Sequence, residues 1–283
     1  MDELSLVSAI RACCGGKGRG VALGIGDDCA ILRLGRGEEL LATTDFVIED
    51  VHFRRKTHTA ADVGWKALGR GLSDVAAMGG EARWALVSLA LPKWAGLRWV
   101  KGFYEGVGEL GTKFGVSVVG GDVTRSEKLT ADVVVLGVSP MGEALRRTGA
   151  RVGDGIYVSG ALGHAAVSGY REKPAPRLEL GRKLRGKASA CMDLSDGLAL
   201  DLRRMCEESG VSAWLDGVLP AAPGATLEQA LGGGEDYELL CTIPEGVLAP
   251  RGLTRIGTVQ KGKAGEVWFA GVKMGAAGWD PFR

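Results

Sequence analysis

The chain has 283 residues, 46% hydrophobic and 24% charged, which is the balance of an ordinary globular protein rather than a disordered or fibrous one. Its 35 Lys and Arg against 34 Asp and Glu give a net charge of +1, so no general positive field favours nucleic acid or an anionic membrane. The length suits two domains, and because no signal peptide and no apolar run of roughly 18 residues is present, we expect a cytoplasmic protein.

Apolar periodicity in the first half predicts alternating strands and helices. Residues 39–47 have the pattern of a strand that ends in a Thr-Thr-Asp motif, which places Asp45 at the strand exit. Residues 63–78 predict an amphipathic helix that carries Asp74, because apolar residues recur every three or four positions and two glycines follow. A strand, a second helix over 97–114 and two further strands complete the order β, α, β, α, β, β.

A polar and basic stretch near the middle of the chain predicts the passage between the two domains, which we place at 1–140 and 141–283. The second half alternates short strands with helices. Within 191–210 a strand runs into a helix whose expected N-cap is Ser195, with Asp196 in the first turn. An anionic ligand at such a helix start would meet backbone N–H groups that have no partner inside the helix.

Six acidic motifs lie in stretches rich in glycine, serine and threonine. They are GIGDD at 24–28, TTD at 43–45, LSD at 72–74, GGDVTR at 120–125, DLSD at 193–196 and GGED at 233–236. Carboxylates on such loops leave room for a ligand, and glycines let backbone amides approach it. A bare carboxylate cluster repels phosphate, whereas the same cluster filled with Mg²⁺ binds it. The pattern indicates nucleotide phosphoryl chemistry, although each aspartate taken singly, above all Asp27 and Asp201, also fits a helix cap or a turn.

Seven segments, taken in order, closely resemble the thiamine-monophosphate kinase family. They are GIGDDCAIL, TTDFVIEDVHF, ALGRGLSDVAAMGGEARWALVSLALP, GGDVTRS, RRTGARVGD, MDLSDGLALDL and GGEDYELL. The resemblance implies a two-domain α/β (α+β) fold of the aminoimidazole-ribonucleotide-synthetase-like superfamily. It also implies a homodimer in which the amino-terminal sheets complete a barrel across the two-fold axis. The implied reaction converts ATP and thiamine monophosphate into ADP and thiamine diphosphate, the last step of thiamine diphosphate biosynthesis, with several Mg²⁺ ions.

The resemblance also implies three sets of site residues. The Mg²⁺ ligands, direct or through water, are Asp28, Thr43, Thr44, Asp45, Asp74, Asp122, Asp193 and Asp196. The contacts to ATP are Tyr104, Gly121, Asp122, Arg147 and Ser195. The thiamine phosphate site is lined by His52, Glu235 and Trp279.

Two phosphate-bearing substrates repel each other, at a cost on the order of 4 kcal/mol for each pair of unit charges ~4 Å apart at an effective dielectric near ~20. We therefore expect direct in-line transfer, with the metals and Arg147 stabilising the charge on the moving phosphoryl group. The acceptor phosphate is already ionised, and no Cys, His or Lys stands in a nucleophile arrangement. No covalent catalytic residue is expected.

Two alternatives stay open. One is another ATP-using enzyme of the superfamily. A selenophosphate synthetase has a reactive Cys and Lys, which are faintly matched here by Cys14-Gly15-Gly16-Lys17. The hydrogenase maturation factor needs a carboxyl-terminal cysteine. The other is a catalytically silent ATP-binding regulator on the same fold. A GxGxxG match at 106–111 falls inside a predicted helix, so it does not indicate a dinucleotide site.

Overall fold

The computed structural model describes residues 3–14, 18–25, 29–275 and 277–279. The chain divides into two compact units, each with its own sheet. Unit 1 comprises Met1–Val75 and Glu81–Gly142, and unit 2 comprises Ala76–Gly80 and Glu143–Arg283. The division lies close to the predicted boundary between residues 140 and 141.

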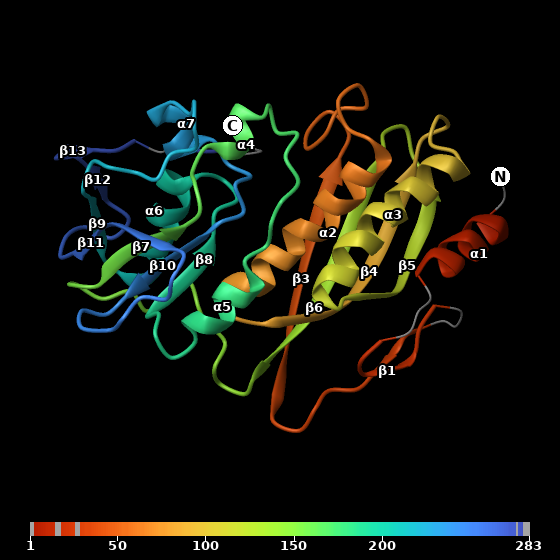
Figure 1. The fold of residues 1–283 in the computed structure, drawn as a ribbon, viewed down its shortest axis with the longest axis horizontal. Helices are drawn as coiled ribbons and strands as arrows, with labels where there is room; N and C mark the ends of the chain where they lie inside the picture. The colour runs from red at the N-terminus through yellow and green to blue at the C-terminus, as the bar shows by residue number, and fades with distance from the viewer. Residues whose placement is uncertain (1–2, 15–17, 26–28, 276, 280–283) are drawn as a thin grey trace. The chain divides into compact units, whose positions relative to one another are not determined.

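Unit 1 is built on a four-stranded sheet with strand order β3-β6-β4-β5. The strands are β3 (Glu38–Ile48), β6 (Thr130–Pro140), β4 (Glu81–Leu91) and β5 (Ser117–Arg125). β4 and β5 pair in parallel, and the other neighbours are antiparallel. Helices α2 (Ala60–Ala77) and α3 (Leu97–Phe114) cover one face of this sheet (Figure 1). The predicted order of strands and helices is therefore confirmed.

Glycines let α2 and α3 pack backbone to backbone. A Cβ on Gly64 would lie 1.9 Å from the carbonyl oxygen of Phe103, and one on Gly106 would lie 1.9 Å from that of Ala61. Since real Cβ atoms do not approach so closely, both positions require glycine. The GxGxxG match at 106–111 thus lies within α3 and has a packing role.

One helix and two short strands precede the unit 1 sheet in the chain. Helix α1 (Glu3–Cys14) contacts α3 and β5, and β1 (Val21–Leu23) pairs with β2 (Ile31–Leu32). The indole N–H of Trp84 donates to the carbonyl of Arg19 at 2.8 Å. These contacts attach the described amino-terminal residues to α3, β4 and β5.

The second face of the unit 1 sheet is covered around Trp84 and Val138 by Val21, Ala30 and Leu32, and it is open along β3. Along β3 the side chains alternate, and the open face presents Leu40, Ala42, Thr44 and Phe46, all exposed. Leu40 and Phe46 are 48% and 54% exposed. Because the alternate residues of a strand lie on opposite faces, Thr43 and Asp45 lie toward the helices instead.

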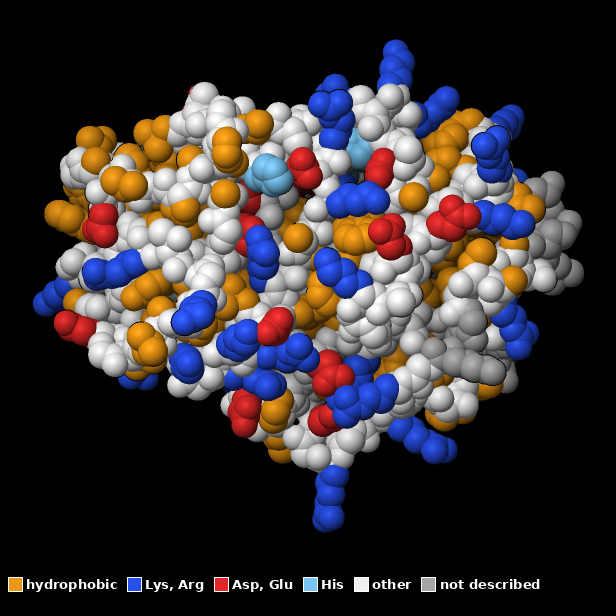
Figure 2. All heavy atoms as spheres, in the orientation of Figure 1, with side chains coloured by type: hydrophobic (Ala, Val, Ile, Leu, Met, Phe, Trp, Pro, Cys, Tyr) orange, Lys and Arg blue, Asp and Glu red, His pale blue; other side chains and the backbone are white. Residues whose placement is uncertain are grey.

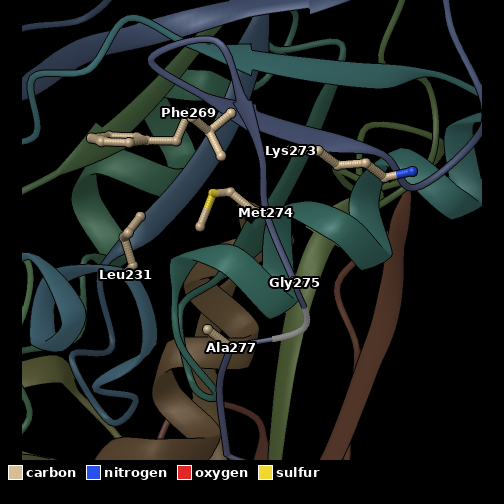
Figure 3. A pocket seen from close by; sticks show the side chains of 7 residues that line it. Leu231, Phe269, Lys273, Met274, Gly275 and Ala277 are labelled. Carbon is tan, nitrogen blue, oxygen red and sulfur yellow. The ribbon is translucent and has the colours of Figure 1, made fainter.

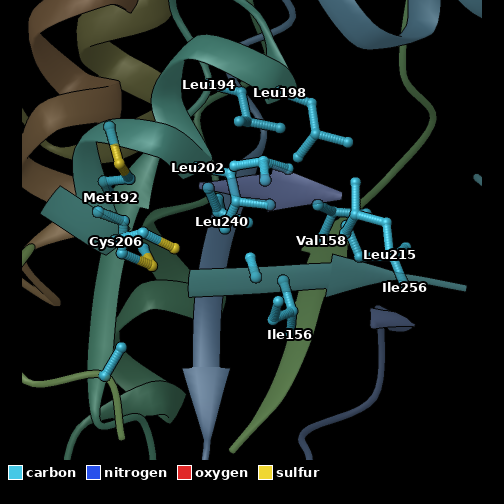
Figure 4. Packing of buried hydrophobic residues seen from close by; sticks show 14 of the residues in the cluster. Ile156, Val158, Met192, Leu194, Leu198, Leu202, Cys206, Leu215, Leu240 and Ile256 are labelled. Carbon is cyan, nitrogen blue, oxygen red and sulfur yellow. The ribbon is translucent and has the colours of Figure 1, made fainter. Parts of the chain in front are cut away.

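Unit 2 has a seven-stranded sheet with strand order β13-β12-β9-β11-β7-β10-β8. Its strands are β7 (Gly155–Ser159), β8 (Ala190–Asp193), β9 (Ser212–Leu215), β10 (Leu239–Ile243), β11 (Leu253–Gln260), β12 (Val267–Phe269) and β13 (Val272–Lys273). Its helices are α4 (His164–Val167), α5 (Leu178–Leu184), α6 (Leu198–Ser209) and α7 (Leu227–Gly232). Figure 4 shows the apolar core between α6 and the strands, where Leu198 and Leu202 face Val158, Leu240 and Ile256. This core holds the start of α6 against the end of β8.

Two sequence predictions about local structure are wrong. Helix α6 begins at Leu198 with Gly197 as its N-cap, not at Ser195, so Asp196 precedes the helix. The reason is that Gly197 has φ 111°, which L-residues rarely adopt, and the side chain of Asp201 accepts the N–H groups of Asp196 and Gly197. Asp45 is not at a strand exit, because pairing with β6 continues β3 to Ile48.

Over the described residues, no helix is both long and apolar enough to cross a membrane. Figure 2 shows acidic and basic side chains interspersed on the visible face, as the net charge of +1 suggests. Ion binding at the acidic motifs therefore depends on the groups that lie close to each motif.

Candidate functional site

On the helix-covered face of unit 1, β3 and α2 bring three predicted metal ligands together. The Thr43 hydroxyl donates to Asp74 Oδ2, and Asp74 lies close enough to Asp45 to lower the pKa of the Asp45 carboxyl. Arg70, one helical turn before Asp74, donates from Nη2 to Asp45 Oδ1 at 3.3 Å. The predicted site residues Thr43, Asp45 and Asp74 therefore form one oxygen-rich cluster with Arg70 at its edge.

Burial and charge act in opposite directions on this cluster. Burial raises the pKa of the Asp45 carboxyl above its ordinary value, and the nearby charge of Asp132 adds to that shift. The Arg70 guanidinium and the hydrogen bond with Asp74 lower the pKa of Asp45. A partly buried carboxylate that needs this compensation is a site where a cation binds favourably.

The open face of the same sheet holds other predicted ligands. The Thr44 hydroxyl donates to Asp132 Oδ1 on the neighbouring strand β6. Strand register places both Asp132 and Asp122 beside Ser88 of β4, so Asp122 lies on this face as well. Thr44 and Asp122 are thus separated by the sheet from Thr43, Asp45 and Asp74.

Asp132 was not identified from the sequence. Its segment, TADVVVLGVSP, has the alternation of an ordinary strand, and neither a glycine nor a second acid adjoins Asp132. Gly121, beside Asp122, has φ 149°, and a Cβ there would lie 1.9 Å from the carbonyl oxygen of Val87. Only glycine fits this position, which brings the β5 backbone against β4 just before Asp122.

His52, predicted to line the thiamine phosphate site, is partly buried after β3. The Ile48 N–H donates to His52 Nδ1 at 3.1 Å, so in the neutral ring the proton lies on Nε2. Burial and the positive charges of Arg70 and Lys66 lower the pKa of His52 to about 4. His52 therefore presents an uncharged N–H donor at neutral pH.

Tyr104, a predicted ATP contact, is a buried residue of the helix layer. Tyr104 is 4% exposed, on α3, and its ring packs edge-on against Phe103 with centroids 5.5 Å apart. Burial, with the charges of Cys14 and Cys13, raises the pKa of the Tyr104 phenol. Asp28 lies outside the described residues.

In unit 2, three distant segments converge on the loop after β8. The Glu235 N–H donates to the Ser195 carbonyl at 2.7 Å, and the Trp279 N–H donates to the Asp196 carbonyl at 2.9 Å. Asp193 ends β8 and is 7% exposed. Five predicted site residues, contributed by the DLSD motif, the GGED motif and the carboxyl-terminal segment, therefore lie at one place.

The GGED segment has an unusual backbone that its side chains hold in place. Glu235 and Tyr237 have φ of 56° and 50°, a left-handed conformation that non-glycine residues seldom adopt. Asp236 accepts the N–H groups of Gly163 and Ala165 at 2.6 and 3.0 Å. Strained backbone of this kind persists where surrounding contacts fix it, as at binding sites.

Glu238, two residues after Asp236, also holds the GGED segment in place. Its buried carboxylate accepts hydrogen bonds from the Ser159 hydroxyl and from Arg177, whose Nε lies 2.7 Å away. Its backbone carbonyl accepts the Leu194 N–H at 2.8 Å. Neither Glu238 nor Arg177 was identified from the sequence, because nothing in the sequence pairs the end of the GGED segment with α5.

Asp201 and Arg204, both in α6, form hydrogen bonds that hold the loop before this helix. Asp201 is 0% exposed and accepts the N–H groups of Asp196 and Gly197 at 3.0 and 3.1 Å. Burial, with the charge of Asp196, raises the pKa of Asp201 to about 6. Arg204 Nη1 donates to Asp196 Oδ2 and to Asp201 Oδ1. Asp201 is therefore the structural cap that the sequence left open as an alternative to a ligand.

Arg147, a predicted ATP contact, is exposed beside β8. The preceding residue, Arg146, accepts the Cys191 N–H at 2.8 Å through its carbonyl. This contact fixes the Arg147 backbone along the edge strand of the unit 2 sheet, and its side chain is accessible to an anionic ligand.

The donor atoms fit Mg²⁺ in kind, because the predicted ligands offer carboxylate and hydroxyl oxygens. Among the described residues, no group of three or more His, Cys, Asp or Glu side chains is arranged to hold a metal ion. Mg²⁺ usually takes one or two carboxylates and completes its coordination with water and substrate phosphates. Pairs such as Asp45 with Asp74 suit that mode.

A cavity of about 280 Å³ in unit 2 has different chemistry. Figure 3 shows Leu231, Phe269 and Met274 around it, together with Ala277, which precedes Trp279 by two residues. No carboxylate lines it, so this cavity differs in its chemistry from the acidic loops described above.

Comparison with known proteins identifies the family. The family model for AIR synthase related protein, N-terminal domain, matches residues 26–139. A thiamine-monophosphate kinase of Aquifex aeolicus (strain VF5) is 35% identical over an aligned length of 289, and the alignment covers 91% of this chain and 92% of that protein.

Solved structures agree with this result. A thiamine-monophosphate kinase from Stenotrophomonas maltophilia K279a has a TM-score of 0.83 at 34% identity, covering 97% of this chain and 98% of that one. AaThiL complexed with AMPPCP and TMP has a TM-score of 0.81 at 33% identity, covering 99% and 97%. Escherichia coli HypE, a hydrogenase maturation protein, has a TM-score of 0.77 at 20% identity, a likeness that shows the fold alone. The chain belongs to the thiamine-monophosphate kinase family and has the AIR synthase-like α/β fold.

Proposed function

We infer that this protein is an ATP-dependent kinase that converts thiamine monophosphate into thiamine diphosphate, the last step of thiamine diphosphate biosynthesis. One observation carries the inference most directly: a related structure at 33% identity over 99% of this chain is complexed with AMPPCP and TMP. AMPPCP is an ATP analogue, so that protein holds a nucleotide and the phosphate acceptor together. ATP is accordingly a substrate of this chain.

We assign the phosphate chemistry to the loops of the two units. In unit 1 Thr43, Asp45 and Asp74 would hold Mg²⁺, with Thr44 and Asp122 on the opposite face of the sheet. In unit 2 Asp193 and Asp196 would serve as ligands, and Ser195 and Arg147 would contact ATP. Bound Mg²⁺ would supply positive charge that lowers the repulsion between the two phosphate-bearing substrates.

The reaction proceeds by in-line displacement at the γ-phosphorus of ATP. An oxygen of the thiamine monophosphate phosphate forms the new bond as the bond to the β,γ-bridging oxygen breaks, and ADP leaves. The acceptor oxygen is already ionised, so no residue has to remove a proton from it. Arg147 offers a planar guanidinium for the charge that spreads over the moving phosphoryl group.

Thiamine monophosphate binding falls to His52, Glu235 and Trp279. The neutral ring of His52 donates from Nε2, a hydrogen bond that suits a phosphate oxygen. The Glu235 carboxylate suits the cationic thiazolium ring, and the indole of Trp279, 53% exposed, offers a flat apolar surface to an aromatic ring.

A homodimer would complete unit 1. The open face presents Leu40 and Phe46 to solvent at 48% and 54% exposure, although apolar side chains of this size are usually covered. A second copy with the same face would cover both. This supports a barrel of two amino-terminal sheets across a two-fold axis.

Product analysis tests the proposed function. Purified protein with ATP, Mg²⁺ and thiamine monophosphate is expected to yield thiamine diphosphate and ADP in equal amounts, separated by chromatography. Parallel reactions with thiamine and with selenide test other acceptors. If ATP binds but no acceptor is phosphorylated, the protein is a silent ATP-binding regulator; if only selenide reacts, it is a selenophosphate synthetase.

A further inference from the structure

In unit 2 the Asp196 carboxylate already has a cation beside it. Arg204 lies on α6 and donates from Nη1 both to Asp196 Oδ2 and to Asp201 Oδ1, the latter at 3.0 Å. The Arg204 side chain is 37% exposed, whereas that of Asp201 is 0% exposed. The guanidinium therefore covers the outer side of the loop, above a buried carboxylate that the backbone also holds.

Unit 1 has the same arrangement on a different helix. Arg70 of α2 lies with Nη2 3.3 Å from Asp45 Oδ1, and the two side chains are 14% and 22% exposed. Arg70 also precedes Asp74 by one helical turn. In each unit, then, a helix places an arginine against one aspartate that the proposed function assigns to Mg²⁺.

The charge balance shows what these arginines do. Asp196 and Asp201 carry two negative charges when ionised, and Arg204 reduces the total to one. A guanidinium that contacts a carboxylate also repels a divalent cation approaching that carboxylate. A neutral hydrogen-bond donor would orient the metal-binding carboxylate without repelling the metal ion. A charged arginine both orients the carboxylate and repels the ion.

We propose that Arg70 and Arg204 are built-in counter-cations, which compete with Mg²⁺ for Asp45 and Asp196. This inference rests on the proposed function, since it takes those aspartates as ligands. When nucleotide is absent, each guanidinium neutralises its aspartate and weakens metal binding. When ATP is present, its phosphates offer the displaced guanidinium a new anionic partner, so metal and nucleotide bind more tightly together than singly.

Mn²⁺ binding to the nucleotide-free protein, measured by electron paramagnetic resonance, tests the proposal. Arg204→Met is expected to bind Mn²⁺ about tenfold more tightly than the parent protein, because the variant removes a unit positive charge that repels the metal ion from the Asp196 carboxylate. Arg204→Lys keeps the charge and should stay near the parent value. Arg203→Met is the matched control, because Arg203 is the neighbouring residue of α6 and pairs with Glu207 at 2.8 Å.

The direction of the change separates competition from structural damage. Damage to the loop would weaken Mn²⁺ binding, whereas loss of a competitor strengthens it. Equal or weaker binding in Arg204→Met, with circular dichroism and thermal unfolding like those of Arg203→Met, overturns the proposal. Arg70→Met repeats the test in unit 1, which keeps the question decidable if Arg204→Met fails to fold.

Asp196→Asn distinguishes this proposal from the proposed function. If Asp196→Asn binds Mn²⁺ as tightly as the parent, Asp196 is not a ligand and the site assignment fails. If Asp196→Asn binds weakly while Arg204→Met matches the parent, the ligand assignment stands and only the competition is refuted. Adding AMPPCP should narrow the difference between the parent and Arg204→Met; a difference that stays unchanged would argue against the exchange of carboxylate for phosphate.

Discussion

The backbone N–H of Glu235 donates to the carbonyl oxygen of Ser195 at 2.7 Å. This bond joins the GGED and DLSD motifs, which are far apart in the sequence. It also explains why Glu235 adopts φ 56°, since the contact requires the chain to turn sharply at that residue. The backbone of the proposed substrate residue is thus bonded to the proposed nucleotide loop.

Asp45→Asn is expected to lower kcat by a factor on the order of 100 while the fold is kept, because the amide cannot replace an ionised ligand. Steady-state kinetics and circular dichroism provide the measurement. Asp50→Asn is the control, since Asp50 forms an exposed pair with Lys128 at 3.3 Å and such pairs contribute little. Near-normal turnover of Asp45→Asn would show that Asp45 holds no essential metal.

Glu238→Gln is expected to lower the free energy of unfolding by about 1–3 kcal/mol, because two charge-assisted hydrogen bonds from Arg177 lose their ionised acceptor. Urea denaturation measures the change. Glu179→Gln removes a carboxylate whose side chain is 75% exposed and paired with Lys183, and it should have a much smaller effect. Equal losses in the two variants would contradict a special role for the buried pair.

His52 should make folding stability depend on pH. The unfolded chain takes up a proton near the ordinary pKa of 6.5, whereas the folded chain takes it up only near about 4. Protons therefore favour the unfolded state in this window, and stability should fall as the pH decreases from about 6.5 to about 4. In His52→Gln this part of the pH dependence should disappear.

Urea denaturation at several pH values measures the effect, with His164→Gln, at a 59% exposed position, as the control.

The lowered pKa of His52 also affects the binding of thiamine monophosphate. Because His52 stays neutral above its folded pKa, the affinity for thiamine monophosphate should show no change caused by this residue near neutral pH. A titration of binding that follows His52 near its ordinary pKa would refute the assigned tautomer and charge.

Phe46→Glu is expected to shift the protein from dimer to monomer, because charged groups on the open face would oppose each other across a two-fold axis. Sedimentation velocity gives the oligomeric state. Val272→Glu provides a matched control, since Val272 is also apolar and 69% exposed but lies in unit 2. A parent protein that sediments as a monomer would contradict the dimer itself.

Local patterns along the chain were sufficient to predict the elements and the family. The periodicities of α2 and α3 are properties of the chain that depend on near neighbours, so their bounds were predicted to within a few residues. The acidic motifs could be found because glycine, serine and threonine mark loops, whichever way those loops face.

Which side chains lie close together depends on the folded chain. Strand register separates Thr44 from Thr43 and Asp45 and gives Thr44 the partner Asp132, which no local pattern marks. Helix packing and the buried Asp201 move the start of α6 past Asp196, and they bring Arg204 to that residue. These contacts join segments that are distant in the chain, so they depend on register and packing over the whole unit rather than on the residues beside them.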